Sequence, residues 1–177
     1  MNTIRRRSRL ALALAIAVGF GLAGAAAPQT PKDPANAALA FDKLKTLTGR
    51  WEAMSEKGKA SAAYQVVSNG TAILEHVIIP GEAEMITVYY LDGNRLLLTH
   101  FCEAGNQPRL QAGGFDPKTN SIDFQFLDAT NLASPDTGHM HHVVIKFRGP
   151  SEMVEEWTWY QGGKPGFTVP LVYHRID

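Results

Sequence analysis

The amino-acid sequence predicts an all-β protein, an antiparallel up-and-down β-barrel of about ten strands with one N-terminal helix. Short apolar runs follow one another from Trp51 onward, and turn-forming pairs such as Asn69-Gly70 and Asp92-Gly93 separate them. No helical stretch of about 10–15 residues lies between the runs, which excludes a parallel α/β sheet. Closing the sheet leaves no strand edge unpaired, so we expect a barrel; a two-sheet sandwich is the alternative.

The helix is expected over Ala35–Leu47, because Leu39–Phe41, Leu44 and Leu47 recur at helical spacing while charged residues occupy the other face. Gly49 then ends it. The strands expected after it span residues 51–55, 60–67, 71–79, 84–90, 95–103, 108–112, 121–128, 139–147, 152–160 and 167–175. Most of the connections between them are short enough for hairpins.

The chain divides into three parts. Residues 1–26 resemble a signal peptide, because arginines cluster at positions 5–9 and a short apolar run with small residues follows them. Residues 27–36 are predicted to form a linker, and residues 37–177 the barrel domain. A retained membrane anchor is the alternative for the first part, but its apolar run is shorter than the ~20 residues that a spanning helix needs. We therefore expect a secreted or periplasmic protein with no membrane span in the mature chain.

The charged residues and the cysteine exclude two further classes. The chain has 17 Lys and Arg against 17 Asp and Glu, but four of the arginines belong to the signal segment. The mature chain thus has an acidic excess and lacks the basic stripe that nucleic-acid binding needs. Cys102 is the single cysteine, so the fold does not rest on an intrachain disulfide. Its thiol is either a small buried side chain or a free group at a site.

Side chains alternate between the two faces of a strand, and this rule places the candidate site residues. Four strands are expected to turn polar or aromatic groups inward together with apolar ones. These groups are His100 and Cys102; Phe124, Phe126 and Asp128; His139 and His141; and Glu155, Trp157 and Trp159. We therefore expect the lumen of the barrel to carry imidazoles from at least two strands.

The end of the helix and the start of the first strand read Leu44-x-x-Leu47-x-Gly49-Arg50-Trp51. This segment resembles the Gly-x-Trp signature of lipocalins and other calycin barrels. The resemblance implies that the tryptophan closes the base of the barrel and that an arginine of the last strand, here Arg175, packs over it. A guanidinium on an indole face contributes about 0.5–2 kcal/mol, so the pairing is physically sensible.

A narrower resemblance covers about residues 39–175, nearly the whole mature chain. The segments that carry it are 85–93, 98–102, 105–109, 124–131 and 139–141. Together they are similar to a lipocalin-like family of secreted bacterial proteins that carries a domain-of-unknown-function label. The resemblance implies a barrel and supplies no activity.

The favoured function is binding of a small apolar or amphiphilic molecule in the lumen. Arg109, beside the rigid Pro108, is a candidate to grip a ligand carboxylate, although it could equally pair with Asp128 and order two loops. Asn131 is either a ligand contact or a turn residue. The residues expected to contact the ligand are His100, Cys102, Arg109, Phe124, Phe126, Asp128, Asn131, His141, Trp157 and Trp159.

Other hypotheses use the histidines or a filled barrel. His139 and His141 are two apart in one strand, and with His100 they would form a zinc or copper site in a barrel enzyme. Haem held through His100 or His141 is a second alternative, and an envelope interaction protein is a third. Histidines at a barrel mouth are also common as hydrogen-bonded polar residues. The sequence contains no Gly-x-Ser-x-Gly elbow, phosphate loop or dinucleotide fingerprint, so it favours binding over catalysis and leaves the cofactor unknown.

Overall fold

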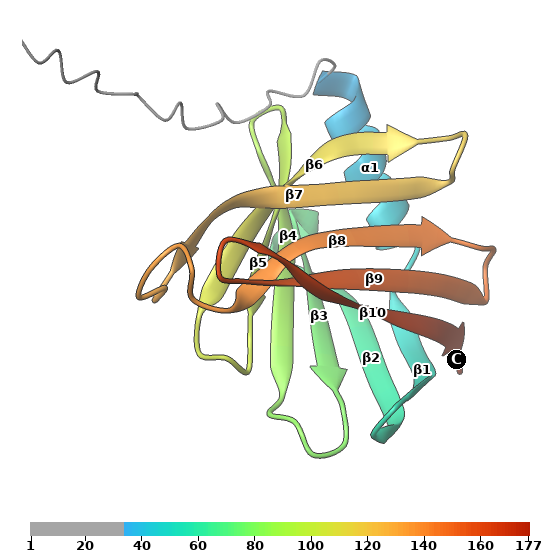
Figure 1. The fold of residues 1–177 in the computed structure, drawn as a ribbon. Helices are drawn as coiled ribbons and strands as arrows, with labels where there is room; N and C mark the ends of the chain where they lie inside the picture. The colour runs from blue at the N-terminus through green and yellow to red at the C-terminus, as the bar shows by residue number, and fades with distance from the viewer. Residues whose placement is uncertain (1–33) are drawn as a thin grey trace, which may run out of the picture.

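The computed structural model describes residues 34–177 and shows a closed antiparallel β-barrel with α1 (Pro34–Lys45) at one end (Figure 1). The strands are β1 (Gly49–Ser55), β2 (Gly58–Val67), β3 (Ala72–Ile78), β4 (Met85–Asp92), β5 (Arg95–Phe101), β6 (Gln107–Asp116), β7 (Ser121–Thr130), β8 (His139–Phe147), β9 (Glu152–Gln161) and β10 (Lys164–Arg175). Each pairs with its neighbours in the sequence, and β1 pairs with β10 to close the ring. The predicted fold class is confirmed.

Strand β6 is longer than the 108–112 that the sequence predicts. It continues to Asp116 through a β-bulge, at which the pairing with β7 shifts before Phe115. Gly114 in this bulge has φ +112°, and a Cβ there would lie 2.5 Å from Nδ2 of Asn36. The side-chain oxygen of Asn36 in turn accepts a hydrogen bond from the backbone N–H of Phe115 at 2.9 Å. The glycine therefore lets the start of α1 lie directly on β6.

The end of the barrel beside α1 is closed by Trp51 and Arg175, which pair across β1 and β10. Trp51 is buried, and its Nε1 donates a hydrogen bond to the carbonyl of Leu47 at 2.7 Å. The Arg175 guanidinium lies 4.1 Å from the centroid of the indole and donates to the carbonyls of Thr46 and Thr48 at 2.8 and 2.6 Å. The predicted packing of Arg175 over Trp51 is confirmed.

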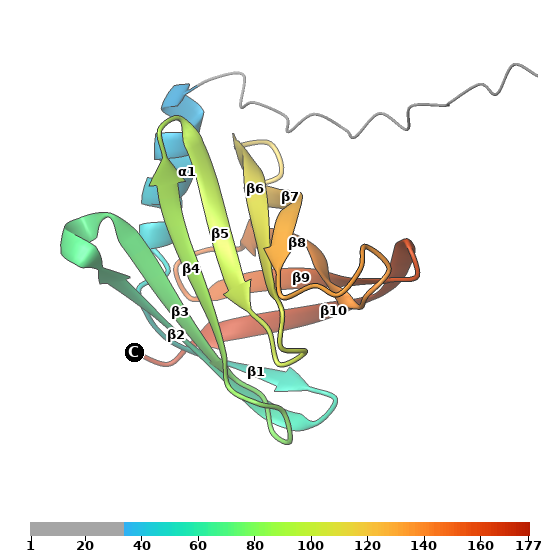
Figure 2. The same cartoon turned by 90° about the vertical axis from the view of Figure 1, so that its left-hand side faces the viewer.

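Helix α1 lies across the same end, against β4, β5 and β6, while the β1–β2 and β3–β4 connections lie at the opposite end (Figure 2). Its buried side chains are Ala37, Ala40, Phe41 and Leu44. The predicted signal peptide, residues 1–26, lies outside the described residues; of the predicted linker, residues 34–36 form the start of α1. Within residues 34–177, no helix has the length and apolar character needed to cross a membrane.

Candidate functional site

The barrel is hollow at the end opposite α1. A cavity of about 970 Å³ lies there, bordered by the β1–β2, β3–β4 and β5–β6 connections. Its walls are mainly apolar, with Met54, Val77, Ile79, Met85, Met140, Trp157, Trp159, Phe167, Val169 and Leu171 among the lining residues. The half beside α1 is filled by large buried side chains that do not line the cavity, such as Trp51, Leu96, Phe124 and Ile145.

A level of polar side chains separates the filled half from the hollow half. Tyr64, Glu75, Thr87 and His100 lie opposite one another in turn on β2, β3, β4 and β5, and all four are buried. Their common register puts them on the inner face together, because each is separated by one position from buried apolar residues of its own strand. Two further side chains reach this level from the facing wall, and we call the six residues the polar belt: Tyr64, Glu75, Thr87, His100, Glu155 and Tyr173.

Two glutamates of the polar belt face each other without a basic partner. Tyr64 Oη and Trp157 Nε1 donate hydrogen bonds to Glu155, the latter at 3.1 Å, and Tyr89 Oη donates to Oε2 of Glu75 at 2.7 Å. Burial raises the pKa of both carboxyls, and repulsion by Glu155 raises the pKa of Glu75 further. Burial and mutual repulsion disfavour ionisation of both carboxyls together, so the pair favours a state that shares one proton.

His100 is joined to the same pair through Thr87. Nδ1 of His100 lies 3.0 Å from Oγ1 of Thr87, and Thr87 lies opposite Glu75 in the sheet. Burial lowers the pKa of His100 to about 4, and the ring is therefore neutral near pH 7. Its Nε2 has no hydrogen-bond partner among the described residues.

Three polar atoms on the cavity wall have no hydrogen-bond partner among the described residues. They are Oε1 of Glu75, Nε2 of His100 and the hydroxyl of Tyr173. A buried polar group without a partner costs about 1–3 kcal/mol, so a protein that retains three of them beside a cavity has a specific use for that cost. The inner end of the cavity is therefore prepared to receive hydrogen bonds from something that enters it.

Four of the predicted ligand-contacting residues lie together in this lumen: His100, Cys102, Trp157 and Trp159. The His100 ring lies 4.6 Å from the indole of Trp157, centroid to centroid. Burial raises the pKa of the Cys102 thiol, so this group is protonated and matches the interpretation as a small buried side chain. The prediction that Glu155 faces inward with the two tryptophans is also confirmed.

His139 and His141 were expected to line the lumen, and neither of them lines the cavity. A β-bulge in β8 falls at His141, since Met140 lies opposite Trp159 while His142 lies opposite Thr158. The extra residue reverses the alternation, so Met140 lines the cavity instead of the two histidines.

The two histidines form a hydrogen-bonded pair of their own. Nδ1 of His139 lies 2.7 Å from the carbonyl of Thr137, and its Nε2 lies 2.8 Å from Nδ1 of His141. Rings of Phe126 and Tyr160 lie 4.4 and 4.0 Å from that of His141, centroid to centroid. Burial and the neighbouring His139 lower the pKa of His141 to about 4. Phe126 thus packs on these rings, and neither Phe126 nor His141 lines the cavity.

The histidines predicted to bind zinc or copper are consequently not brought together. His100 belongs to the polar belt, whereas His139 and His141 lie at and before the bulge in β8 and do not line the cavity. Residues 34–177 contain no group of three or more His, Cys, Asp or Glu side chains that could hold a metal ion. The three-histidine site is therefore not formed in this fold. The same bulge keeps His141 out of the lumen as a haem ligand, and His100 alone remains there.

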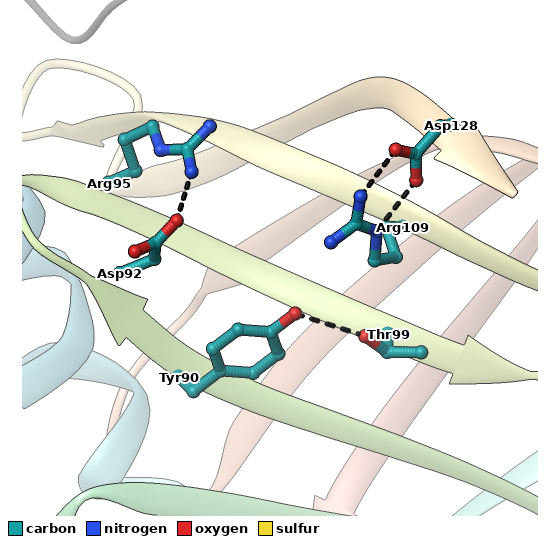
Figure 3. Close-up of polar contacts among 6 residues, drawn as sticks. All are labelled: Tyr90, Asp92, Arg95, Thr99, Arg109 and Asp128. Carbon is teal, nitrogen blue, oxygen red and sulfur yellow. Dashed lines mark hydrogen bonds and ion pairs between the residues drawn. The ribbon is translucent and has the colours of Figure 1, made fainter.

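Arg109 and Asp128 were expected at the lumen, and the structure places them on the outer face (Figure 3). Arg109 lies opposite Thr99, between buried neighbours in its own strand, and its Nε donates to Oδ1 of Asp128 at 2.6 Å. Its Nη2 also contacts this carboxylate, and the ion pair lowers the pKa of Asp128. A β-bulge in β7 explains the error: Asp128 pairs with Arg109 but Phe126 pairs with Leu110, so the alternation slips by one residue. The alternative, in which the two residues pair with each other, is the correct one.

Asn131 and Phe124 also lie away from the cavity. Asn131 has φ +55° and donates through Nδ2 to the carbonyl of Gly105, so it is a turn residue that ties two loops together. Phe124 is buried in the filled half, where its ring lies 5.8 Å from that of Tyr89. Neither residue lines the lumen.

The sequence alone does not identify Tyr64, Glu75, Thr87 or Tyr173 of the polar belt. A signal for Glu75 was present, because it alternates with Ile73 and Val77 as Glu155 alternates with apolar residues in β9. Both faces of this segment carry large apolar groups and one ionisable residue, however, so alternation alone does not decide which face is inside. Thr87 becomes identifiable only through its register with Glu75 and His100.

Comparison of the sequence with protein-family models and with curated proteins finds no match. The resemblance to lipocalin-like proteins accordingly stays a prediction, and the arguments for function come from the lumen itself.

Proposed function

We propose that the protein binds a small, largely apolar molecule in its lumen, with the polar end of that molecule at the polar belt. The observation that supports the proposal is a cavity of about 970 Å³ with apolar walls, at whose inner end His100 and Tyr173 have unpaired polar atoms. Pockets that enclose small ligands have volumes of about 300–1,000 Å³, mainly apolar walls and a few convergent polar groups. The lumen has all three properties.

The energetics of such binding follow from the two kinds of surface. The apolar part of a ligand gains about 25 cal/mol for each Å² that it removes from water against side chains such as Val77, Met85 and Trp159. Its polar end satisfies atoms of the polar belt, and each such atom otherwise costs about 1–3 kcal/mol. The two contributions act at opposite ends of the same molecule, and this arrangement favours an amphiphilic ligand.

A pair of neighbouring substitutions tests the proposal. Val77 lines the cavity, whereas the next residue, Ile78, is exposed on the outer face of β3. Val77→Phe adds a ring inside the lumen and should weaken binding of the neutral apolar dye Nile red by about tenfold or more, measured by fluorescence titration. Ile78→Phe should leave the affinity unchanged, and circular dichroism would confirm that both variants are folded. Equal affinities of the two folded variants, or no binding of Nile red or other apolar molecules to the wild type, would overturn the proposal.

A further inference from the structure

We propose that the ligand of the lumen is an apolar amine, whose ammonium group lies against the carboxyls of Glu75 and Glu155. This inference rests on the lumen-binding function proposed above and specifies its ligand class. The charges that line the cavity carry the first part of the argument. Five glutamates line it, Glu56, Glu75, Glu82, Glu103 and Glu155, together with a single lysine and no arginine.

The lysine does not neutralise the inner end of the lumen. Lys57 lies at the β1–β2 connection, and its Nζ forms an ion pair with Glu82 at 2.8 Å. Glu75 and Glu155 lie deeper, at the polar belt, and their hydrogen-bond partners are neutral: Tyr64 and Trp157 for Glu155, and Tyr89 for Glu75. A ligand carboxylate at this level would meet two carboxyls and no cation, whereas a ligand cation would meet two groups of complementary charge.

The unpaired atoms at the inner end of the lumen give a second argument. Oε1 of Glu75 is buried and has no hydrogen-bond partner among the described residues. The Tyr173 hydroxyl and Nε2 of His100 are unpaired as well. An ammonium group has three N–H donors and no acceptor, so it can donate to the unpaired oxygen of Glu75 and to the Tyr173 hydroxyl. A carboxylate or phosphate, which only accepts, has no proton to offer an ionised Glu75.

The proton that the glutamates share has to go somewhere when the amine binds. A positive charge beside the pair favours ionisation of both carboxyls, so the pair loses its shared proton to solvent and two carboxylates face the ammonium. The ionisable groups that face the pair are Tyr64 on β2, Tyr89 on β4, His100 on β5 and Tyr173 on β10. Burial raises the pKa of the three phenols and lowers that of His100 to about 4, so all four are neutral near pH 7. The glutamate pair is therefore the source of the released proton.

The test compares three probes of equal chain length on the intact mature protein by isothermal titration calorimetry at pH 7: dodecylamine, 1-dodecanol and dodecanoate, each below its micellar concentration. We expect dodecylamine to bind at least about tenfold more tightly than 1-dodecanol, and dodecanoate to bind most weakly. Titration in buffers of different ionisation enthalpy should show proton release with the amine and none with the alcohol. Dodecanoate binding as tightly as the amine would overturn the inference and leave the proposed function intact, whereas no binding by any of the three would overturn both.

Two substitutions sharpen the test. Glu155→Gln should lower the affinity for dodecylamine by about tenfold and leave that for 1-dodecanol unchanged, because only the charged ligand uses the carboxylate. Glu56→Gln is the matched control, since Glu56 borders the same cavity but is exposed at its mouth. It should change neither affinity by more than about twofold. If Glu155→Gln binds the alcohol normally, and is therefore folded, yet keeps full affinity for the amine, the inference is wrong.

Discussion

The two halves of this barrel are built from the same strands, yet their interiors differ in kind. Beside α1 the inward side chains are large and apolar, and Trp51 is sealed by Arg175 at 4.1 Å. Beyond the polar belt the inward side chains border a cavity of about 970 Å³. Closure of the sheet satisfies the backbone hydrogen bonds of both halves equally, whatever lies inside. Stability that comes from side-chain packing can therefore be concentrated in one half.

This division has a physical consequence for the binding half. A cavity and buried carboxyls without a basic partner both destabilise a fold, and Glu75 and Glu155 lie at the boundary where the cavity begins. The filled half must offset these costs. Substitutions of similar chemistry should accordingly affect stability on one side of the polar belt and ligand binding on the other.

The largest expected effect compares two tryptophans. Trp51→Ala removes a buried indole that packs against the Arg175 guanidinium and donates a hydrogen bond to the carbonyl of Leu47. This substitution should lower the free energy of unfolding by about 3–5 kcal/mol. Trp159→Ala removes a partly exposed indole that lines the cavity, and should cost about 1 kcal/mol or less while weakening binding of apolar probes. Urea denaturation measures the first effect and fluorescence titration the second.

Similar losses in the free energy of unfolding for Trp51→Ala and Trp159→Ala would contradict this comparison of the two halves. Equal destabilisation would mean that the hollow half contributes as much to packing as the filled half. A Trp51→Ala protein that stays within about 1 kcal/mol of the wild type would show that the base of the barrel is not a principal source of stability.

A smaller effect, of opposite sign, is expected at the boundary between the halves. Burial raises the pKa of Glu75 in the folded protein above the value of about 4.3 in an unfolded chain. The folded state then holds a proton that the unfolded state releases, so this group lowers stability progressively as pH rises above about 4.3. Glu75→Gln removes the effect, and should raise the free energy of unfolding at pH 7 by about 1–2 kcal/mol.

His100 changes the stability with pH in the direction opposite to Glu75. The pKa of His100 is lowered to about 4 from about 6.5, so its contribution to stability is present above pH 6.5 and is lost as pH falls toward 4. Between about pH 4.3 and 6.5 the two groups oppose each other in the wild type, and Glu75→Gln should leave stability rising more steeply with pH. Urea denaturation at several pH values measures this. A variant that is less stable at pH 7, with an unchanged profile, would show that the Glu75 carboxyl stabilises the fold.

How much the sequence could predict depends on whether a feature is local. Strand positions follow from turn residues close to each strand, and α1 from the spacing of its apolar residues, so these were predicted well. The inward direction of His100, Cys102, Trp157 and Trp159 was also predicted, because simple alternation holds on both strands from the filled half to the cavity.

Three predicted site residues failed for one physical reason. Asp128 and His139 lie beyond β-bulges as seen from the regular part of each strand, and His141 lies within one. One extra residue shifts the alternation of the side chains on its far side. A bulge is defined by the pairing of two strands, and neither strand's own sequence shows it. Arg109 failed with its partner Asp128. Four members of the polar belt, Tyr64, Glu75, Thr87 and Tyr173, escaped prediction because they come from separate strands that only the register of the sheet aligns.

The smallest expected effect is that of a substitution on the outer face of the barrel. It provides a reference for the changes in stability and in binding expected from the two halves of the interior. Arg109→Ala breaks an ion pair with Asp128 whose members are both substantially exposed. Exposed pairs contribute about 0.2–1 kcal/mol, so denaturation should show a change within that range. Binding of Nile red should not change, since Arg109 does not line the cavity. Loss of binding in a variant of normal stability would mean that Arg109 reaches the ligand, and that the β-bulge in β7 does not separate the ion pair from the lumen.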